Sequence, residues 1–220
     1  MELEGLTGQF YRISLVISRM AYINILWIIF TLLGLIVFGF MPATVGLFAV
    51  IRKWLMGEKD IPIFSTFWMN YRREFLKSNL LGLILFVIGY ILYIDFTFLP
   101  AGGFYTFIRV GLVMVTILYA IILLYIFPVY VHYEWKLRLY LKYALLLGAG
   151  HPHFTFLMII GGGALYYVCT LIPGIIPFFS VSILAYIMMW TAYVVIKKME
   201  DMQVASEEVA EEEAGEENDI

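Results

Sequence analysis

Long runs of apolar residues without charge make up most of this chain. Residues 20–51 and residues 143–196 contain no Asp, Glu, Lys or Arg, and the two runs are 32 and 54 residues long. A helix needs about 20 apolar residues to cross the hydrocarbon core of a bilayer, so the second run is long enough for two crossings. The pattern therefore predicts an all-α fold, a polytopic transmembrane helical bundle.

The first run is too long for one straight crossing. A helix of 32 residues would measure roughly 48 Å, whereas a bilayer with its headgroups is about 40–45 Å thick. Pro42 lacks a backbone donor and clashes with the preceding turn, and Gly39 lies nearby, so we expect a break there. This predicts a span over residues 22–40 and a short return or re-entrant helix over residues 42–56. A single kinked span is the alternative.

Four further spans bring the prediction to five clear spans plus the short helix after Pro42. They are expected at residues 79–94, 107–127, 154–171 and 178–196. Turns that contain Pro and Gly separate them at residues 95–106 and 172–177.

Three other segments have an amphipathic pattern. Residues 1–21 predict an N-terminal interfacial helix, because apolar side chains and Arg fall on different faces; the alternative is that this segment extends the first span. Residues 129–147 predict a surface helix, and residues 57–78 predict another with an aromatic and a basic face. The candidate partner or lipid surface on the latter consists of Trp68, Arg72, Arg73 and Lys77.

Charge is strongly segregated. Hydrophobic residues are 63% and charged residues 14% of the sequence, against about 45–50% and 25% in soluble domains. Residues 1–199 hold all 14 basic and 7 of the 17 acidic side chains, a net charge of +7, and the other ten acids follow. We therefore predict a transmembrane domain over residues 22–198 and a disordered acidic tail over residues 199–220.

The basic clusters predict the orientation. Residues 52–78, 129–152 and 197–198 hold most of the Lys and Arg, and the positive-inside rule places such segments in the cytoplasm. The C-terminal tail is then cytoplasmic. Arg12 and Arg19 favour a cytoplasmic N-terminus as well.

No catalytic, cofactor or metal motif stands out. His132-x-Glu134 and His151-Pro-His153 match no zinc signature, and a single cysteine, Cys169, excludes an internal disulfide. Nucleotide-binding and hydrolase motifs are absent from the sequence. We expect no enzyme activity, no cofactor, no metal and no nucleic-acid partner.

Polar residues near the span ends are better functional hints, because an unsatisfied polar group is costly in lipid. Asn24, Asn79 and Asp95 are the candidates, and interfacial anchoring suits their positions. Asp95 and Arg109 flank one predicted turn, so we also expect these two to form a candidate outer pair that closes a helical hairpin.

Several short motifs carry a family resemblance: Asn24-Ile-Leu-Trp27, Gly39-Phe-Met-Pro42-Ala43-Thr44 and Glu74-Phe-Leu-Lys77-Ser78-Asn79. Over residues 20–82 the chain resembles the YesL-like family of small bacterial integral membrane proteins. The resemblance implies a multi-pass protein of the bacterial plasma membrane, and a link to carbohydrate uptake, because members are often encoded beside carbohydrate-uptake ABC transporters. The motif residues are Asn24, Trp27, Pro42, Thr44 and Asn79.

Two functions fit these observations. The first is an accessory or regulatory component of carbohydrate uptake, with the lipid bilayer and ABC-type sugar transporter components as partners. The second is a small-solute transporter or channel, with a broken-helix pathway near Asn24, Pro42 and Asn79. The sequence predicts no oligomeric state.

Overall fold

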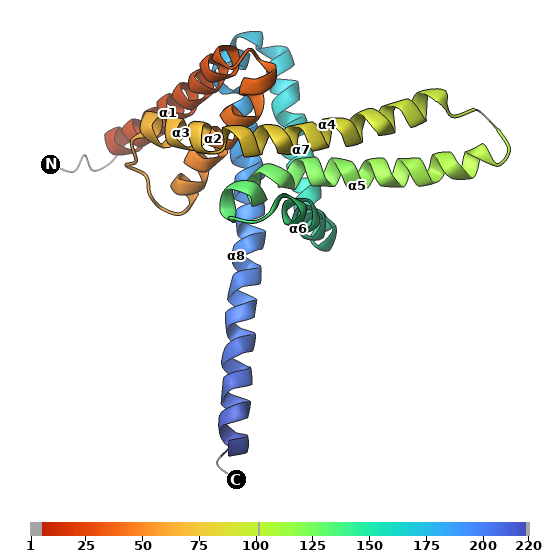
Figure 1. Cartoon of the computed structure of the whole chain (residues 1–220). Coiled ribbons are helices and arrows are strands. Elements are labelled where there is room, and N and C mark those ends of the chain that lie inside the picture. Colours follow the sequence, from red (N-terminus) through yellow and green to blue (C-terminus); the bar gives the residue numbers. More distant parts are fainter. Residues whose placement is uncertain (1–5, 101, 219–220) are drawn as a thin grey trace.

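The computed structural model describes residues 6–100 and 102–218, and it contains eight α-helices, one short 3₁₀ helix and, within those ranges, no β-strand (Figure 1). Six helices are long and apolar enough to cross a membrane, which confirms an all-α polytopic bundle. The helices are α1 (Leu6–Leu33), α2 (Val37–Leu55), α3 (Ile63–Arg73), α4 (Phe75–Phe98), α5 (Tyr105–His132), α6 (Leu137–Gly150), α7 (Pro152–Leu171), η1 (Pro173–Ile175) and α8 (Ile176–Asn218).

Two clusters of buried side chains hold the helices together, and α8 contributes to both. One cluster joins α1, α2, α3 and α8 and includes Ile23, Leu47, Phe67 and Met189. The other joins α5, α6, α7 and α8 with parts of α2 and α4 and includes Tyr125, Tyr140, Met158 and Val195. Figure 1 shows the α4–α5 hairpin extending sideways from this body, crosswise to α8, whose C-terminal part projects alone.

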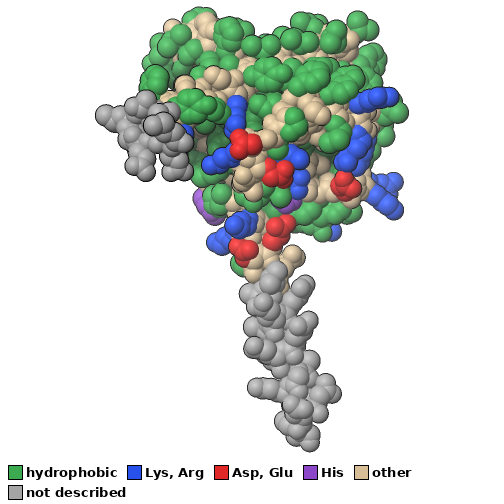
Figure 2. Space-filling model, turned by 90° about the vertical axis from the view of Figure 1, so that its left-hand side faces the viewer, with side chains coloured by type: hydrophobic (Ala, Val, Ile, Leu, Met, Phe, Trp, Pro, Cys, Tyr) green, Lys and Arg blue, Asp and Glu red, His purple; other side chains and the backbone are tan. Residues whose placement is uncertain are grey.

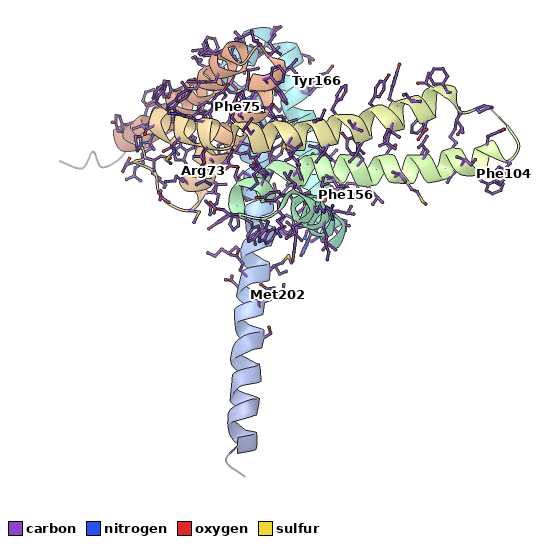
Figure 3. The ribbon with its side chains drawn as sticks, viewed as in Figure 1. Arg73, Phe75, Phe104, Phe156, Tyr166 and Met202 are labelled. Atoms are coloured by element: carbon purple, nitrogen blue, oxygen red, sulfur yellow. The ribbon has the colours of Figure 1, made fainter. Side chains whose placement is uncertain are left out.

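Many large apolar side chains on the outer surface remain exposed, as expected where lipid rather than protein covers a helix. They are most frequent on α1, α4, α5 and α7. Figure 3 labels four exposed apolar side chains, namely Phe104 at the tip of the α4–α5 hairpin, Phe156 and Tyr166 on α7, and Met202 on α8.

The break in the first apolar run lies at Gly34–Ile36, so the predicted break at Gly39–Pro42 was wrong. A Cβ on Gly34 would lie 2.2 Å from the Cα of Gly39. Only two glycines allow the chain to fold back this tightly. As a result α2 has 19 residues, with Pro42 inside it, and is long enough to cross the membrane.

The turn itself is strained. Leu35 and Ile36 have φ angles of 56° and 64°, a region that side-chain-bearing residues rarely adopt. The Val37 amide donates to the Leu35 carbonyl at 2.7 Å, which makes Ile36 the centre of a γ-turn. The side chains of Leu35 and Ile36 are exposed, so packing within the chain does not explain why they occupy these positions.

Three other predicted boundaries differ from the structure. α1 is one continuous helix from Leu6, so no helix boundary separates residues 6–21 from the first span, and the interfacial position of those residues stays a prediction. α4 begins at Phe75, directly after α3. α5 continues through Pro128 to His132 before α6 begins at Leu137, so residues 129–147 are not one surface helix.

The predicted boundary at Met199 is not a helix end, because α8 continues to Asn218. Glu and Ala, which are frequent in this segment, are good helix formers, whereas the prediction weighed only charge and low hydropathy. An isolated helix is marginal in water without packing. Disorder of the tail in solution therefore stays a prediction.

Candidate functional site

Pro42 and Asn79 form a joint between α2 and α4. Pro42 has no backbone N–H, so the carbonyl of Phe38, four residues earlier, loses its usual helical donor. The Asn79 side chain supplies a replacement, because its Nδ2 donates to the Phe38 carbonyl at 3.0 Å and to the Phe75 carbonyl at 2.8 Å. Two motif residues that lie 37 positions apart thus serve one hydrogen bond.

Trp27 and Thr44 form a second joint, between α1 and α2. The indole Nε1 of Trp27 donates to Thr44 Oγ1 at 3.1 Å, and that hydroxyl donates to the Phe40 carbonyl at 2.7 Å. The Trp27 N–H and the Thr44 hydroxyl therefore both find acceptors within the bundle.

Asn24 forms a third joint, between the first and the last helix. Its side chain is fully buried. Nδ2 donates to the Pro177 carbonyl at 2.7 Å, and Oδ1 accepts from the amides of Val181 and Ser182 at 3.1 and 2.9 Å. Four of the five motif residues thus bond between helices, and the fifth, Pro42, leaves free the carbonyl that Asn79 binds; polar groups are commonly used in this way in membrane bundles.

Apart from these three joints, polar side chains gather around a cleft of about 620 Å³, where α2, α3, α4, α5 and α6 meet. Figure 2 shows Lys, Arg, Asp and Glu side chains gathered low on one face, beside the emerging α8 and below a mostly hydrophobic surface. The polar lining consists of Arg52, Lys53, Asn70, Arg73, Glu74, Lys77, Tyr130, His132, Tyr133, Glu134 and Tyr140.

Every polar residue in this lining belongs to segment 52–78 or segment 129–152. Both segments are predicted to be cytoplasmic. Four of the lining residues are Lys or Arg and two are Glu, so the lining has a net charge of +2 with His132 neutral. The structure thus brings the separate basic clusters into one place.

Arg73, labelled in Figure 3, is the centre of an ion-pair network. Its Nε donates to Glu74 at 2.9 Å and its Nη2 donates to Glu134 at 2.9 Å. The Tyr130 hydroxyl donates to the other oxygen of Glu74 at 2.8 Å. The hydrogen bond to Glu74 raises the pKa of Arg73 above its ordinary value, so the cation persists. The Glu74 side chain is only 14% exposed and relies on these partners.

Lys77 lies between two tyrosines. Its Nζ donates to the Tyr140 hydroxyl at 3.0 Å and lies 5.1 and 5.3 Å from the ring centroids of Tyr140 and Tyr130, within the range of cation–π attraction. The Tyr140 hydroxyl donates in turn to the Tyr133 carbonyl and accepts from the Trp135 amide. The Tyr140 hydroxyl, bound to Lys77, therefore fixes the α5–α6 connection against α4.

The cleft also contacts the middle of α8. Glu200 lies 3.4 Å from His132 Nε2 and accepts from the Tyr133 hydroxyl at 3.1 Å. Burial, together with that hydrogen bond, raises the pKa of Tyr133 to about 12. Arg52 Nε approaches His132 Nδ1 at 3.5 Å. The first acidic residue of the tail is thus part of the same network.

The predicted partner surface is divided by the structure. Arg73 and Lys77 line the cleft. Trp68 packs against Phe30 and Tyr71, with ring centroids 5.4 and 5.9 Å apart, and together with Arg72 it lies on an outer face. Sequence reasoning missed Glu74, Tyr130, Tyr140 and Arg52 as cleft residues.

The predicted outer pair is not formed: within the described part of the chain, Asp95 and Arg109 make no ion pair with each other. Arg109 instead donates to the Leu99 carbonyl at 3.4 Å. Leu99 directly follows α4, where carbonyls lack helical donors, so this acceptor competes with the exposed Asp95 carboxylate.

The candidate metal ligands also separate. His132 faces Glu200, whereas Glu134 faces Arg73. Residues 6–100 and 102–218 contain no group of three or more His, Cys, Asp or Glu side chains that could hold a metal. The expectations of no metal and no cofactor stay predictions.

Comparisons with known proteins identify the family. The model described as "Protein of unknown function, DUF624" matches residues 20–96. Three proteins of Bacillus subtilis (strain 168), each described as uncharacterized, are similar over most of their length. YteU is 44% identical over 91% of this chain and 90% of its own, YesV 40% over 84% and 90%, and YesL 33% over 85% and 89%.

No solved structure matches the chain. The similarity to YesL confirms the resemblance that the Asn24, Pro42 and Asn79 motifs indicated. Taken with the six membrane-length helices, these relatives show that the chain is a polytopic membrane protein that belongs to the DUF624 family.

Proposed function

We propose that this protein is an accessory component of a bacterial carbohydrate-uptake system, with a binding rather than a catalytic role, and that the cleft receives its partner. The observation that carries the proposal is the cleft itself, where five helices bring positive charge and tyrosines to one face. The link to carbohydrate uptake comes from what the family resemblance implies about the neighbours of such proteins. ABC-type transporter components are therefore the partners we propose.

The charge of the cleft favours an acidic segment of the partner. The lining has a net charge of +2, and complementary charge speeds encounter and suppresses wrong partners. Arg73 and Lys77 already bond within the cleft. Among the residues that the structure describes, Arg52 and Lys53 are engaged only by His132 at 3.5 Å and by Glu58 at 3.3 Å, so these two cations are the ones we assign to the partner.

The test is affinity isolation in mild detergent, followed by identification of the co-purifying proteins. The double variant Arg52→Gln/Lys53→Gln removes two cations from the cleft wall and should strongly reduce partner recovery. The matched control Arg138→Gln/Lys142→Gln removes the same charge from exposed positions outside the lining and should leave recovery unchanged. Equal recovery with both double variants would contradict the proposal.

The transporter alternative has weaker support, because Asn24 and Asn79 use their amides on backbone groups of neighbouring helices. Solute flux into liposomes that contain only this protein would nevertheless reverse our preference. The informative control is Asn79→Leu, which should abolish such flux if the residue lines a pathway.

A further inference from the structure

A second cavity, of about 680 Å³, lies between α1, α8 and the loop that joins α2 to α3. It shares no lining residue with the cleft. One wall is a stripe of α8 in which Phe179, Ile183 and Tyr186 follow one another at helical spacing. The facing wall is α1, with Ile17 and Met20. The space between the two helices is therefore long and apolar.

Two basic side chains border this apolar groove. Arg19 comes from α1 and Lys59 from the loop. Arg19 is bound to Asp60 at 3.1 Å, but the Asp60 side chain is 96% exposed, so this pair is held weakly. The border as a whole is positive, because Asp60 offsets only one of the two cations.

A third side chain at the groove, Trp54, has an unsatisfied hydrogen-bond donor. Trp54 lines the groove, and its indole Nε1 is buried with no hydrogen-bond acceptor among the described residues. A buried donor without an acceptor costs about 1–3 kcal/mol. An ester carbonyl or a phosphate oxygen that entered beside the flexible Lys59 side chain would be an acceptor of the right kind.

We propose that this groove binds one anionic phospholipid, with an acyl chain between α1 and α8 and the phosphate at Arg19 and Lys59. The volume suits a single small amphiphile, since ligand sites measure about 300–1,000 Å³, whereas a stable protein partner needs about 800 Å² of surface. Basic side chains attract anionic lipid headgroups by about 1 kcal/mol each. The apolar walls and the positive border together match no other common constituent of a bilayer.

Native mass spectrometry of the detergent-purified protein tests this. Delipidated protein is titrated with phosphatidylglycerol or with phosphatidylcholine of the same acyl chains, and we expect only phosphatidylglycerol to fill one site. Arg19→Gln/Lys59→Gln should weaken phosphatidylglycerol binding about 30-fold, the factor for about 2 kcal/mol at 1.4 kcal/mol per tenfold change. The matched control Arg138→Gln/Lys142→Gln removes one Arg and one Lys from exposed positions outside the groove and should change nothing.

Ile183→Trp gives an independent test, because a larger side chain in the α8 wall should exclude the acyl chain without changing the charge. If a charge variant fails to fold, the preference of the wild-type protein for phosphatidylglycerol still decides. Equal binding of both lipids, binding unaffected by Ile183→Trp, or a dimer in place of a lipid adduct would each overturn the proposal.

Discussion

The joint between Pro42 and Asn79 makes a quantitative prediction. Replacing Asn79 by Ala removes the donor to the Phe38 carbonyl, and Pro42 cannot replace it. Phe38 lies on an exposed face of a membrane-length helix, where lipid offers no donor. An unsatisfied carbonyl costs about 1–3 kcal/mol in proteins generally, and hydrogen bonds in membrane bundles reach about 1.7 kcal/mol. We expect a loss of about 1–2 kcal/mol of unfolding free energy.

The same substitution should cost far less once Pro42 is replaced by Ala. The alanine N–H can then donate to the Phe38 carbonyl within α2, so Asn79 loses its main task. Equilibrium unfolding in mixed micelles, read as a double-mutant cycle, measures the coupling between the two sites, which we expect to be about 1 kcal/mol. Additive effects, with Asn79→Ala equally costly in both backgrounds, would refute the reasoning. Asn70→Ala is the control, because Asn70 bonds only within its own helix.

Three further predictions follow from the turn, the charge pattern and the tail. Ile36→Gly should raise the unfolding free energy by about 1 kcal/mol, because glycine relieves the positive φ angle; lower stability in the same unfolding assay would show the turn is unstrained. On a Cys169→Ala background, an impermeant thiol reagent should label Gly102→Cys in whole cells and leave Asp60→Cys unlabelled; the reverse pattern would invert the topology. Removing residues 203–220 should leave thermal stability of the purified protein unchanged, since Glu200 remains; a large drop would mean that the tail is docked.

The number of spans could be predicted because bilayer thickness limits how an apolar run can fold. The position of the first turn could not. Pro42 is a strong local signal, whereas Gly34 matters only through its contact with Gly39 on the other side of the turn. Asn79 can supply the donor that Pro42 lacks only because α4 packs there. When the role of a residue depends on contact with a partner elsewhere in the chain, the pattern of apolar and polar residues around it does not reveal that role.

The cleft was only half predictable for a similar reason. Arg73 and Lys77 stood out as cations near a span end. Tyr130 lies near a predicted span end and suits the interfacial aromatic belt that membrane proteins commonly have, whereas Tyr140 lies within the predicted surface helix at residues 129–147. Their role appears only when α4, α5 and α6 converge on Lys77 and Glu74.

The joint at Asn24 has a consequence for how the protein is made. Its partners on α8 lie 153 to 158 residues further along the chain. Ribosomes add about 5–20 residues per second, so α1 waits roughly 8–30 s in the membrane before its amide can bind Pro177 and Ser182. A nascent chain that stops before α8 can never close this joint. The final span therefore completes the bundle, and a shortened chain leaves the Asn24 side chain without its partners on α8.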